Sequence, residues 1–272
     1  MKRNRKTLGI MAVVADLTLL LSGCVTGVVD LDDDDWDHSG NYEASADFSE
    51  TVGAASRTAL HVLGGNGKVE IWGIPGTTEI TIDAVRRVRS SSQADAARHL
   101  DDLQVLVNVN YDDVVVKTLP PDHSHGRTYI VDYEITVPPH LVSRVANGNG
   151  QVRIEGMSTD IHVENGNGDV ALVDVLGSSW VTVGNGQIST WAFLPDDGRI
   201  VNAVGNGSIF LEVQPQVSAT FDAKVGNGSI SLCDLDLQQM MSTPRQLRGV
   251  FGEGDGTIDL ALGNGQIHVQ GG

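Results

Sequence analysis

The chain has 272 residues, of which 40% are hydrophobic and 5% aromatic, and 32 are glycine. This length supports one large domain or two small ones, and the hydrophobic fraction is sufficient for a buried core. The formal net charge of −17 disfavours binding to the nucleic-acid backbone, which is also anionic, so we expect no nucleic-acid partner.

The first 23 residues have the pattern of a bacterial lipoprotein signal peptide. Basic residues, including Lys2 and Arg3, precede an apolar stretch from Leu8 to Leu21. This stretch is too short for a comfortable membrane span. It leads into Leu-Ser-Gly-Cys ending at Cys24, which resembles the motif at which such peptides are cut and the cysteine is acylated. We therefore expect residues 1–23 to be removed and Cys24 to be the lipid attachment site, and hence the membrane to be a partner through the N-terminal lipid. The expected location is the cell envelope, and the outer membrane if the host is Gram-negative.

Residues 24–42 carry a run of aspartates, including Asp32, Asp33, Asp34 and Asp35. Like charges along a segment repel one another and keep it extended. A calcium-binding loop would also need a glycine turn and a terminal glutamate, which this run lacks. We predict an acidic tether without a metal site.

Residues 43–272 are predicted to form one domain, because a Gly-Asn-Gly triplet recurs along them. The triplet occurs seven times, with intervals of 18, 18, 21 and 21 residues between its middle copies. Alternating polar and aliphatic residues follow each triplet, as in Gln151-Val152-Arg153-Ile154, and precede it, as in Trp180-Val181-Thr182-Val183. Such alternation predicts two short, half-buried strands per repeat. The central asparagines are Asn66, Asn149, Asn167, Asn185, Asn206, Asn227 and Asn264.

Two strands in each repeat of about 20 residues form one rung of a β-solenoid, which buries its inner face only by stacking on its neighbours. We expect consecutive rungs to stack in parallel. At the turn, glycine adopts positive φ without steric cost, and asparagine is the next most tolerant residue. Stacked turns bring the asparagine amides into a hydrogen-bonded ladder, so we predict a structural role for all seven.

Two long intervals between triplets indicate insertions, at about residues 83–137 and 236–256. In the first, residues 92–103 are predicted to be helical, and residues 104–118 and 128–137 to be strands. The second has a competing interpretation as two rungs with one degenerate turn.

Three features resemble the bacterial putative-adhesin family, whose β-solenoid is also called the toastrack domain. They are Gly65-Asn66-Gly67-Lys68-Val69-Glu70-Ile71 after a strand, a strand ending in Val137-Pro138-Pro139 before the second triplet, and a run of rungs to the C-terminus. The resemblance covers about residues 58–270. It implies an all-β fold, a single-stranded right-handed parallel β-helix, here with a short helix in an insertion. It carries no catalytic motif, although some relatives accompany envelope-stress or signalling proteins.

Chemistry-bearing motifs are few. A polysaccharide-cleaving β-helix needs clustered carboxylates and a base on one face, whereas Asp196 and Asp197 lie in a single turn segment. His123 and His125 lack a third metal ligand nearby. Cys233 is interpreted as structural or incidental. We expect no catalysis, no cofactor and no metal.

One group of side chains is a candidate binding patch. Arg144, His162 and Trp180 each lie four residues before a triplet, and Glu164 lies two residues after His162. The alternation predicts that all four face outward on adjacent rungs. Tryptophan and arginine are enriched in binding hot spots, so the patch is a candidate surface for a glycan or an envelope protein. The alternative is a mixed surface whose tryptophan is shielded by the first insertion.

The sequence therefore favours a non-catalytic, lipid-anchored envelope protein that presents a β-solenoid to a macromolecular or glycan partner. The alternatives are an accessory protein in envelope-stress signalling and a polysaccharide-active enzyme. Because the chain ends at Gly272 directly after a predicted strand, an uncovered last rung would also permit end-to-end self-association.

Overall fold

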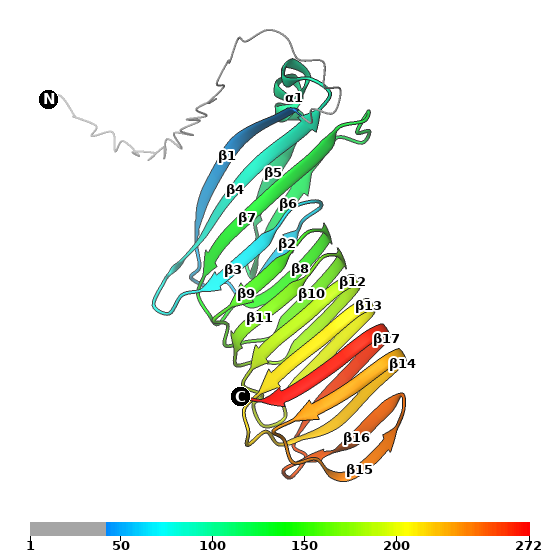
Figure 1. Cartoon of the computed structure of the whole chain (residues 1–272). Coiled ribbons are helices and arrows are strands. Elements are labelled where there is room, and N and C mark those ends of the chain that lie inside the picture. Colours follow the sequence, from blue (N-terminus) through cyan, green and yellow to red (C-terminus); the bar gives the residue numbers. More distant parts are fainter. Residues whose placement is uncertain (1–41) are drawn as a thin grey trace, which may run out of the picture.

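The computed structural model describes residues 42–272, which form an all-β body with one short helix (Figure 1). The predicted signal peptide, Cys24 and all but the last residue of the predicted tether lie outside the described residues. Within residues 42–272, no helix is long and apolar enough to cross a bilayer. The elements are β1 (Tyr42–Gly53), β2 (Ala59–Leu63), β3 (Val69–Gly73), β4 (Glu79–Ser90), α1 (Gln93–Arg98), η1 (Leu100–Asp102), β5 (Gln104–Val109), β6 (Asp113–Leu119), β7 (Thr128–Val137), β8 (Val142–Asn149), β9 (Val152–Glu155), β10 (Ile161–Asn167), β11 (Val170–Val175), β12 (Ser179–Ala192), β13 (Arg199–Val213), β14 (Ala219–Cys233), β15 (Gln238–Thr243), β16 (Gln246–Phe251) and β17 (Gly256–Gly271).

The repeats stack in parallel and in register. β8, β10 and the first half of β12 pair in parallel, so that Arg144, His162 and Trp180 occupy equivalent positions. β9, β11 and the second half of β12 pair in the same way. We call the surface formed by strand segments before the triplets the first face, and the surface formed by segments after them the second face.

Inward side chains from the two faces share one core. Val163 and Val181 of the first face and Ile154 and Leu172 of the second are all at most 1% exposed. Burying each such side chain contributes roughly 1.5–3 kcal/mol. Several inward positions depart from the aliphatic pattern. Two of them, Asn202 and Thr190, are fully buried, and Asn202 donates a hydrogen bond to Thr190 Oγ1 at 3.2 Å.

The Gly-Asn-Gly turn differs in detail from the sequence prediction. The second glycine carries the positive φ, +145° at Gly186, and no triplet asparagine has a positive φ. The first glycine is needed for a different reason: a Cβ on Gly184 would lie 2.4 Å from the carbonyl oxygen of Gly166 on the neighbouring rung. Asparagine is therefore not present for its backbone tolerance.

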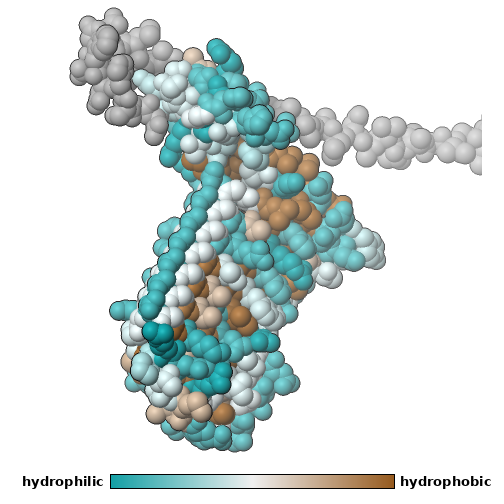
Figure 2. Space-filling view, turned by 90° about the vertical axis from the view of Figure 1, so that its right-hand side faces the viewer, coloured by the Kyte–Doolittle hydropathy of each residue, from teal (hydrophilic) through white to brown (hydrophobic). Residues whose placement is uncertain are grey.

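The triplet asparagines instead form a side-chain ladder, visible in Figure 2 as a straight hydrophilic row flanked by pale residues. Asn185 Nδ2 donates to Asn167 Oδ1 at 2.8 Å, and its own Oδ1 accepts from Asn206 at 2.8 Å. The order along the ladder is Asn66, Asn149, Asn167, Asn185, Asn206, Asn264 and Asn227.

That order corrects the expectation of consecutive stacking. β17 lies between β13 and β14 and pairs with both in parallel. The cause lies in the second insertion, where β15 and β16 form a hairpin and β16 pairs antiparallel with residues 219–224 of β14. The first half of this edge of β14 is therefore occupied, and β17 uses the other edge. The last strand is consequently paired along both edges and is not the uncovered end of the sheet that the sequence suggested.

The sheet has mixed strand orientation, so the expectation of an entirely parallel fold was wrong. β4 pairs antiparallel with both β1 and β7, and β5 pairs antiparallel with β6. β5 and β6 are joined by a tight turn, which permits antiparallel pairing, whereas a parallel connection needs a longer crossover. The predicted strand at 104–118 is one such hairpin, which breaks between Val109 and Asp113. The predicted helix is present as α1 and η1, and Ser92 Oγ caps α1 by accepting from Asp95 N–H.

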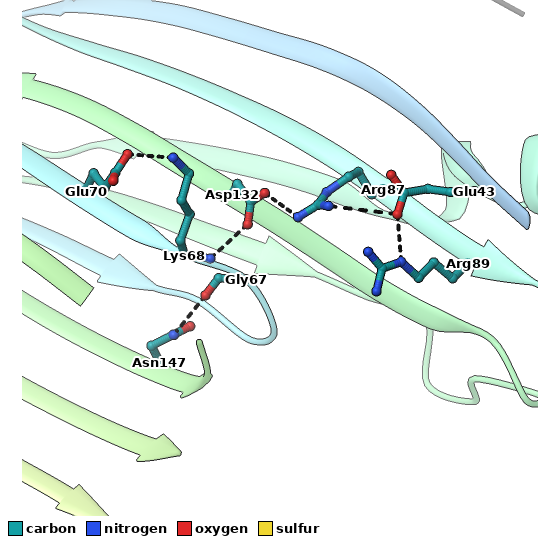
Figure 3. Close-up of polar contacts among 8 residues, drawn as sticks. All are labelled: Glu43, Gly67, Lys68, Glu70, Arg87, Arg89, Asp132 and Asn147. Carbon is teal, nitrogen blue, oxygen red and sulfur yellow. Dashed lines mark hydrogen bonds and ion pairs between the residues drawn. The ribbon is translucent and has the colours of Figure 1, made fainter. Parts of the chain in front are cut away.

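Ion pairs and a hydrogen bond connect the antiparallel strands to the parallel stack (Figure 3). Arg87 of β4 pairs with Asp132 of β7, and Arg89 pairs with Glu43 of β1 at 2.7 Å. Asp132 Oδ1 also accepts the backbone N–H of Lys68 at 2.9 Å, directly before β3. One carboxylate thus connects β4, β7 and the first Gly-Asn-Gly turn.

Candidate functional site

The predicted patch is assembled on the first face. β8, β10 and β12 place Arg144, His162 and Trp180 side by side in one outward column. The rings of His162 and Trp180 stack with centroids 4.5 Å apart and an interplanar angle of 3°. Glu164 faces outward beside this column and is exposed. The register therefore brings together residues that are 18 positions apart in the sequence.

The column has little room for stacking a ligand on Trp180. One side of its ring faces His162, and on the other side the neighbouring strand presents Val201. A sugar ring would have to displace one of these neighbours. The accessible groups of the column are therefore the edges of the two rings and the exposed Arg144 side chain.

The column carries a positive charge on Arg144, although the protein as a whole is acidic. Among the residues that the structure describes, Arg144 forms no ion pair, whereas Arg153 and Arg199 are both paired with carboxylates. Burial, followed by the positive charge of Arg144, lowers the pKa of His162, and Asp160 opposes this effect. His162 is therefore predominantly neutral at pH 7, and Arg144 supplies the positive charge.

A second aromatic surface lies on the second face, and sequence reasoning missed it. Trp191, Phe210 and His268 form a diagonal run across β12, β13 and β17. The Trp191 and Phe210 centroids are 5.7 Å apart, and the Phe210 and His268 centroids are 5.5 Å apart. The alternation could have predicted that Trp191 and Phe210 face outward. The contact of Phe210 with His268 could not be predicted, because it depends on the position of β17.

The surface beside Trp191 is hollowed. Two adjoining hollows of about 400 and 370 Å³ share Trp191, and the larger one is also lined by Phe193 and Arg153. The bulge between Leu172 and Val175 of β11 interrupts the column next to Trp191. Exposed aromatic rings beside a few polar groups are typical of ligand-binding clefts.

Metal-binding and nucleophilic groups are sparse in residues 42–272. No three or more His, Cys, Asp or Glu side chains gather there in a geometry for holding a metal ion. The rings of His123 and His125 meet edge to face at 5.8 Å. Cys233 is an exposed free thiol at the end of β14. Asp196 and Asp197 are exposed in the turn before β13, where Asp197 has a φ of +59°.

No protein-family model and no curated protein matches the chain. Among solved structures, it is similar to a putative cell adhesion protein from Clostridium sporogenes, at 13% identity over 84% of this chain and 100% of that one, with a TM-score of 0.46. It is also similar to a putative adhesin from Bacteroides fragilis, at 11% identity over 82% and 96%, with a TM-score of 0.32. A putative lipid binding protein from Parabacteroides distasonis matches at 8% identity over 85% and 98%, with a TM-score of 0.23.

Proposed function

We propose that this chain is a non-catalytic, lipid-anchored protein of the cell envelope. In this proposal the parallel stack is a β-solenoid, right-handed as parallel crossover connections ordinarily are, and it acts as a rigid adhesin-like scaffold. Its Arg144–His162–Trp180 column binds a macromolecular partner. The single observation that carries the proposal is the in-register alignment of these three side chains on three consecutive rungs.

The chemistry of the column favours a protein partner. The two rings are already stacked on each other, so little conformational entropy is lost when a partner covers them. Arg144 offers a planar donor group for a carboxylate of the partner. Arginine and tryptophan are also the side chains that most often dominate binding energy at protein interfaces.

Site-specific photo-crosslinking in cells tests the binding surface. Thr182 is exposed on the first face, in the row of outward side chains next to Trp180, and a photoreactive residue placed there should yield a discrete protein adduct. The adduct should disappear in the double variant Arg144→Ala, Trp180→Ala. A photoreactive residue at Tyr111, which is 80% exposed in the turn between β5 and β6, is the control and should yield no such adduct. An adduct that survives the double variant would overturn the proposed surface.

Membrane fractionation tests the anchor separately. If Cys24 carries the lipid, Cys24→Ala releases the protein from membranes, whereas Cys233→Ala leaves it membrane-bound. A Cys24→Ala protein that stays with the membrane fraction contradicts lipid anchoring without bearing on the first-face column.

A further inference from the structure

We propose that the second face carries a binding groove for neutral hexose polymers, independent of the first-face column. The groove consists of the aromatic run Trp191, Phe210 and His268, together with Phe193 and the hollow beside Trp191. It lies on the opposite face from Trp180, because β12 crosses the Gly-Asn-Gly turn between Trp180 and Trp191.

The aromatic side chains are partly accessible, because Trp191 and Phe210 are half-buried, as Trp180 is. Phe193 is 55% exposed. Trp191 and Phe210 meet at a tilt of 50° rather than in a stack, so Phe210 does not lie flat on Trp191, although His268 stacks on one face of Phe210. Apolar ring faces turned to solvent beside polar groups are the surface on which the C–H face of a sugar packs.

His268, at one end of the aromatic run, is also held in place before any ligand arrives. His268 Nδ1 lies 2.8 Å from Ser231 Oγ, and its Nε2 lies 3.3 Å from Gln270 Oε1. Gln270 in turn donates to Glu212 Oε2 at 2.6 Å. Fixed side chains reduce the entropy that is lost on binding.

Polar groups around the groove suit hydroxyl groups. Gln187, Gln266 and Gln270 lie along the same strands as the aromatic run, and Glu212 lines the hollow. Planar amides and carboxylates can each bind two neighbouring hydroxyls of a sugar.

The charge of the groove selects neutral over acidic polymers. Asp174 and Glu212 line the hollow with Arg153, and Arg153 is already paired with Glu155 at 2.5 Å and lies over the Trp72 ring at 5.6 Å. The remaining charge is negative, as is the whole chain, so uronates, phosphates and nucleic acids are repelled.

The spacing of the strands suits a polymer. Neighbouring rungs are about 4.8 Å apart, which is close to the length of one hexose unit, and the aromatic run crosses three strands. Successive sugar rings can therefore meet successive strands.

Titration calorimetry of the full chain in detergent tests the groove, with cellohexaose, maltohexaose and mannohexaose as probes and an alginate hexamer as the acidic comparison. At least one neutral hexamer should bind at millimolar concentration or below, and more tightly than the alginate. Trp191→Ala should weaken this binding at least tenfold. Phe193→Ala, a change at the exposed rim, is the second variant if Trp191→Ala fails to fold.

Tyr111→Ala is the matched control, because Tyr111 is 80% exposed in the turn between β5 and β6, far along the stack from the groove. This variant should bind as the parent does. The proposal is overturned if none of the three neutral hexamers binds, if alginate binds more tightly, or if folded Trp191→Ala and Phe193→Ala proteins bind as well as the parent. None of these outcomes alters the crosslinking result expected at the first face.

Discussion

His268 of β17 stacks on Phe210 of β13, with ring centroids 5.5 Å apart and an interplanar angle of 17°. The two residues are 58 positions apart, and β14, β15 and β16 lie between their strands in the sequence. Stacking in sequence order would place Ser231 of β14 beside Phe210 instead. The out-of-order position of β17 therefore creates the aromatic run of the second face.

Disulfide trapping tests this strand order. In a Cys24→Ser, Cys233→Ser background, the pair Ser208→Cys, Gln266→Cys should form an intramolecular disulfide, because these positions are register partners. The pair Ser208→Cys, Ser229→Cys should not, since two strand spacings separate its members by about 9.6 Å and a disulfide needs Cα atoms within about 7 Å. Mass spectrometry of the intact, non-reduced monomer measures both. The opposite result would restore sequential stacking.

Replacing the second glycine of a turn should disrupt the stack. A Cβ on Gly186 would lie 2.3 Å from the carbonyl oxygen of Gly168, and its φ of +145° is unfavourable for alanine. Gly186→Ala should lower the free energy of unfolding by at least about 2 kcal/mol. Gly53→Ala is the control, because a Cβ there meets nothing within 4 Å. Urea unfolding followed by circular dichroism measures both, and equal losses would contradict the close-approach explanation.

The asparagine ladder predicts that replacing an interior asparagine costs more stability than replacing the asparagine at its end. Asn185 takes part in two ladder bonds, whereas Asn227 donates one bond, to Asn264 at 2.9 Å. At about 0.5–1.5 kcal/mol for each hydrogen bond, Asn185→Ala should cost about twice as much stability as Asn227→Ala. Urea midpoints of the two variants give the comparison. An equal or larger cost at Asn227 would argue against the ladder as a stabilising device.

His162 should respond to the loss of its charged neighbour. Arg144 contributes to lowering the pKa of His162, so Arg144→Gln should raise that pKa, as measured by NMR titration of the imidazole signals. Arg199→Gln is the control, because Arg199 pairs with Asp259 and does not contribute to this shift. An unchanged pKa in Arg144→Gln would show that burial alone accounts for the shift.

The sign of the corresponding stability effect follows from linkage. Because the folded-state pKa of His162 lies below its ordinary value of 6.5, the unfolded chain takes up the proton first. This group therefore reduces stability as the pH falls below about 6.5, in addition to any contribution from carboxylates.

The lowered pKa of Asp222 predicts a separate loss of stability in acid. Burial would raise its pKa, but hydrogen bonds from Arg248, Gln246 and Lys224 lower the pKa to about 2. A folded-state pKa below the unfolded value contributes stability above about pH 4, and this stability is lost as the pH falls towards 2. Asp222→Asn should flatten the decrease of unfolding free energy between those values. Asp196→Asn, in an exposed turn, should leave the decrease unchanged, and the same flattening in both variants would contradict the assignment.

Much of the local structure could be predicted from the sequence. The alternation around each triplet predicted the strands and the inward positions, such as Val163 and Val181, because a strand turns successive side chains to opposite faces. Equal spacing also predicted that Arg144, His162 and Trp180 would align. The hairpin at 104–119 was not predicted, although Asn110 and Asp112 at its break are turn-favouring residues.

The sequence by itself determined the repeating unit: two half-buried strands joined by a glycine-rich turn, with an asparagine in each turn that bonds to the next. It did not determine which units are neighbours. β14 and β17 present equivalent registers, so both match the edge of β13. The tertiary structure decided between them, because the β15–β16 hairpin covers one edge of β14 and leaves the other edge for β17. That choice, made by contacts far apart in the chain, brings His268 beside Phe210.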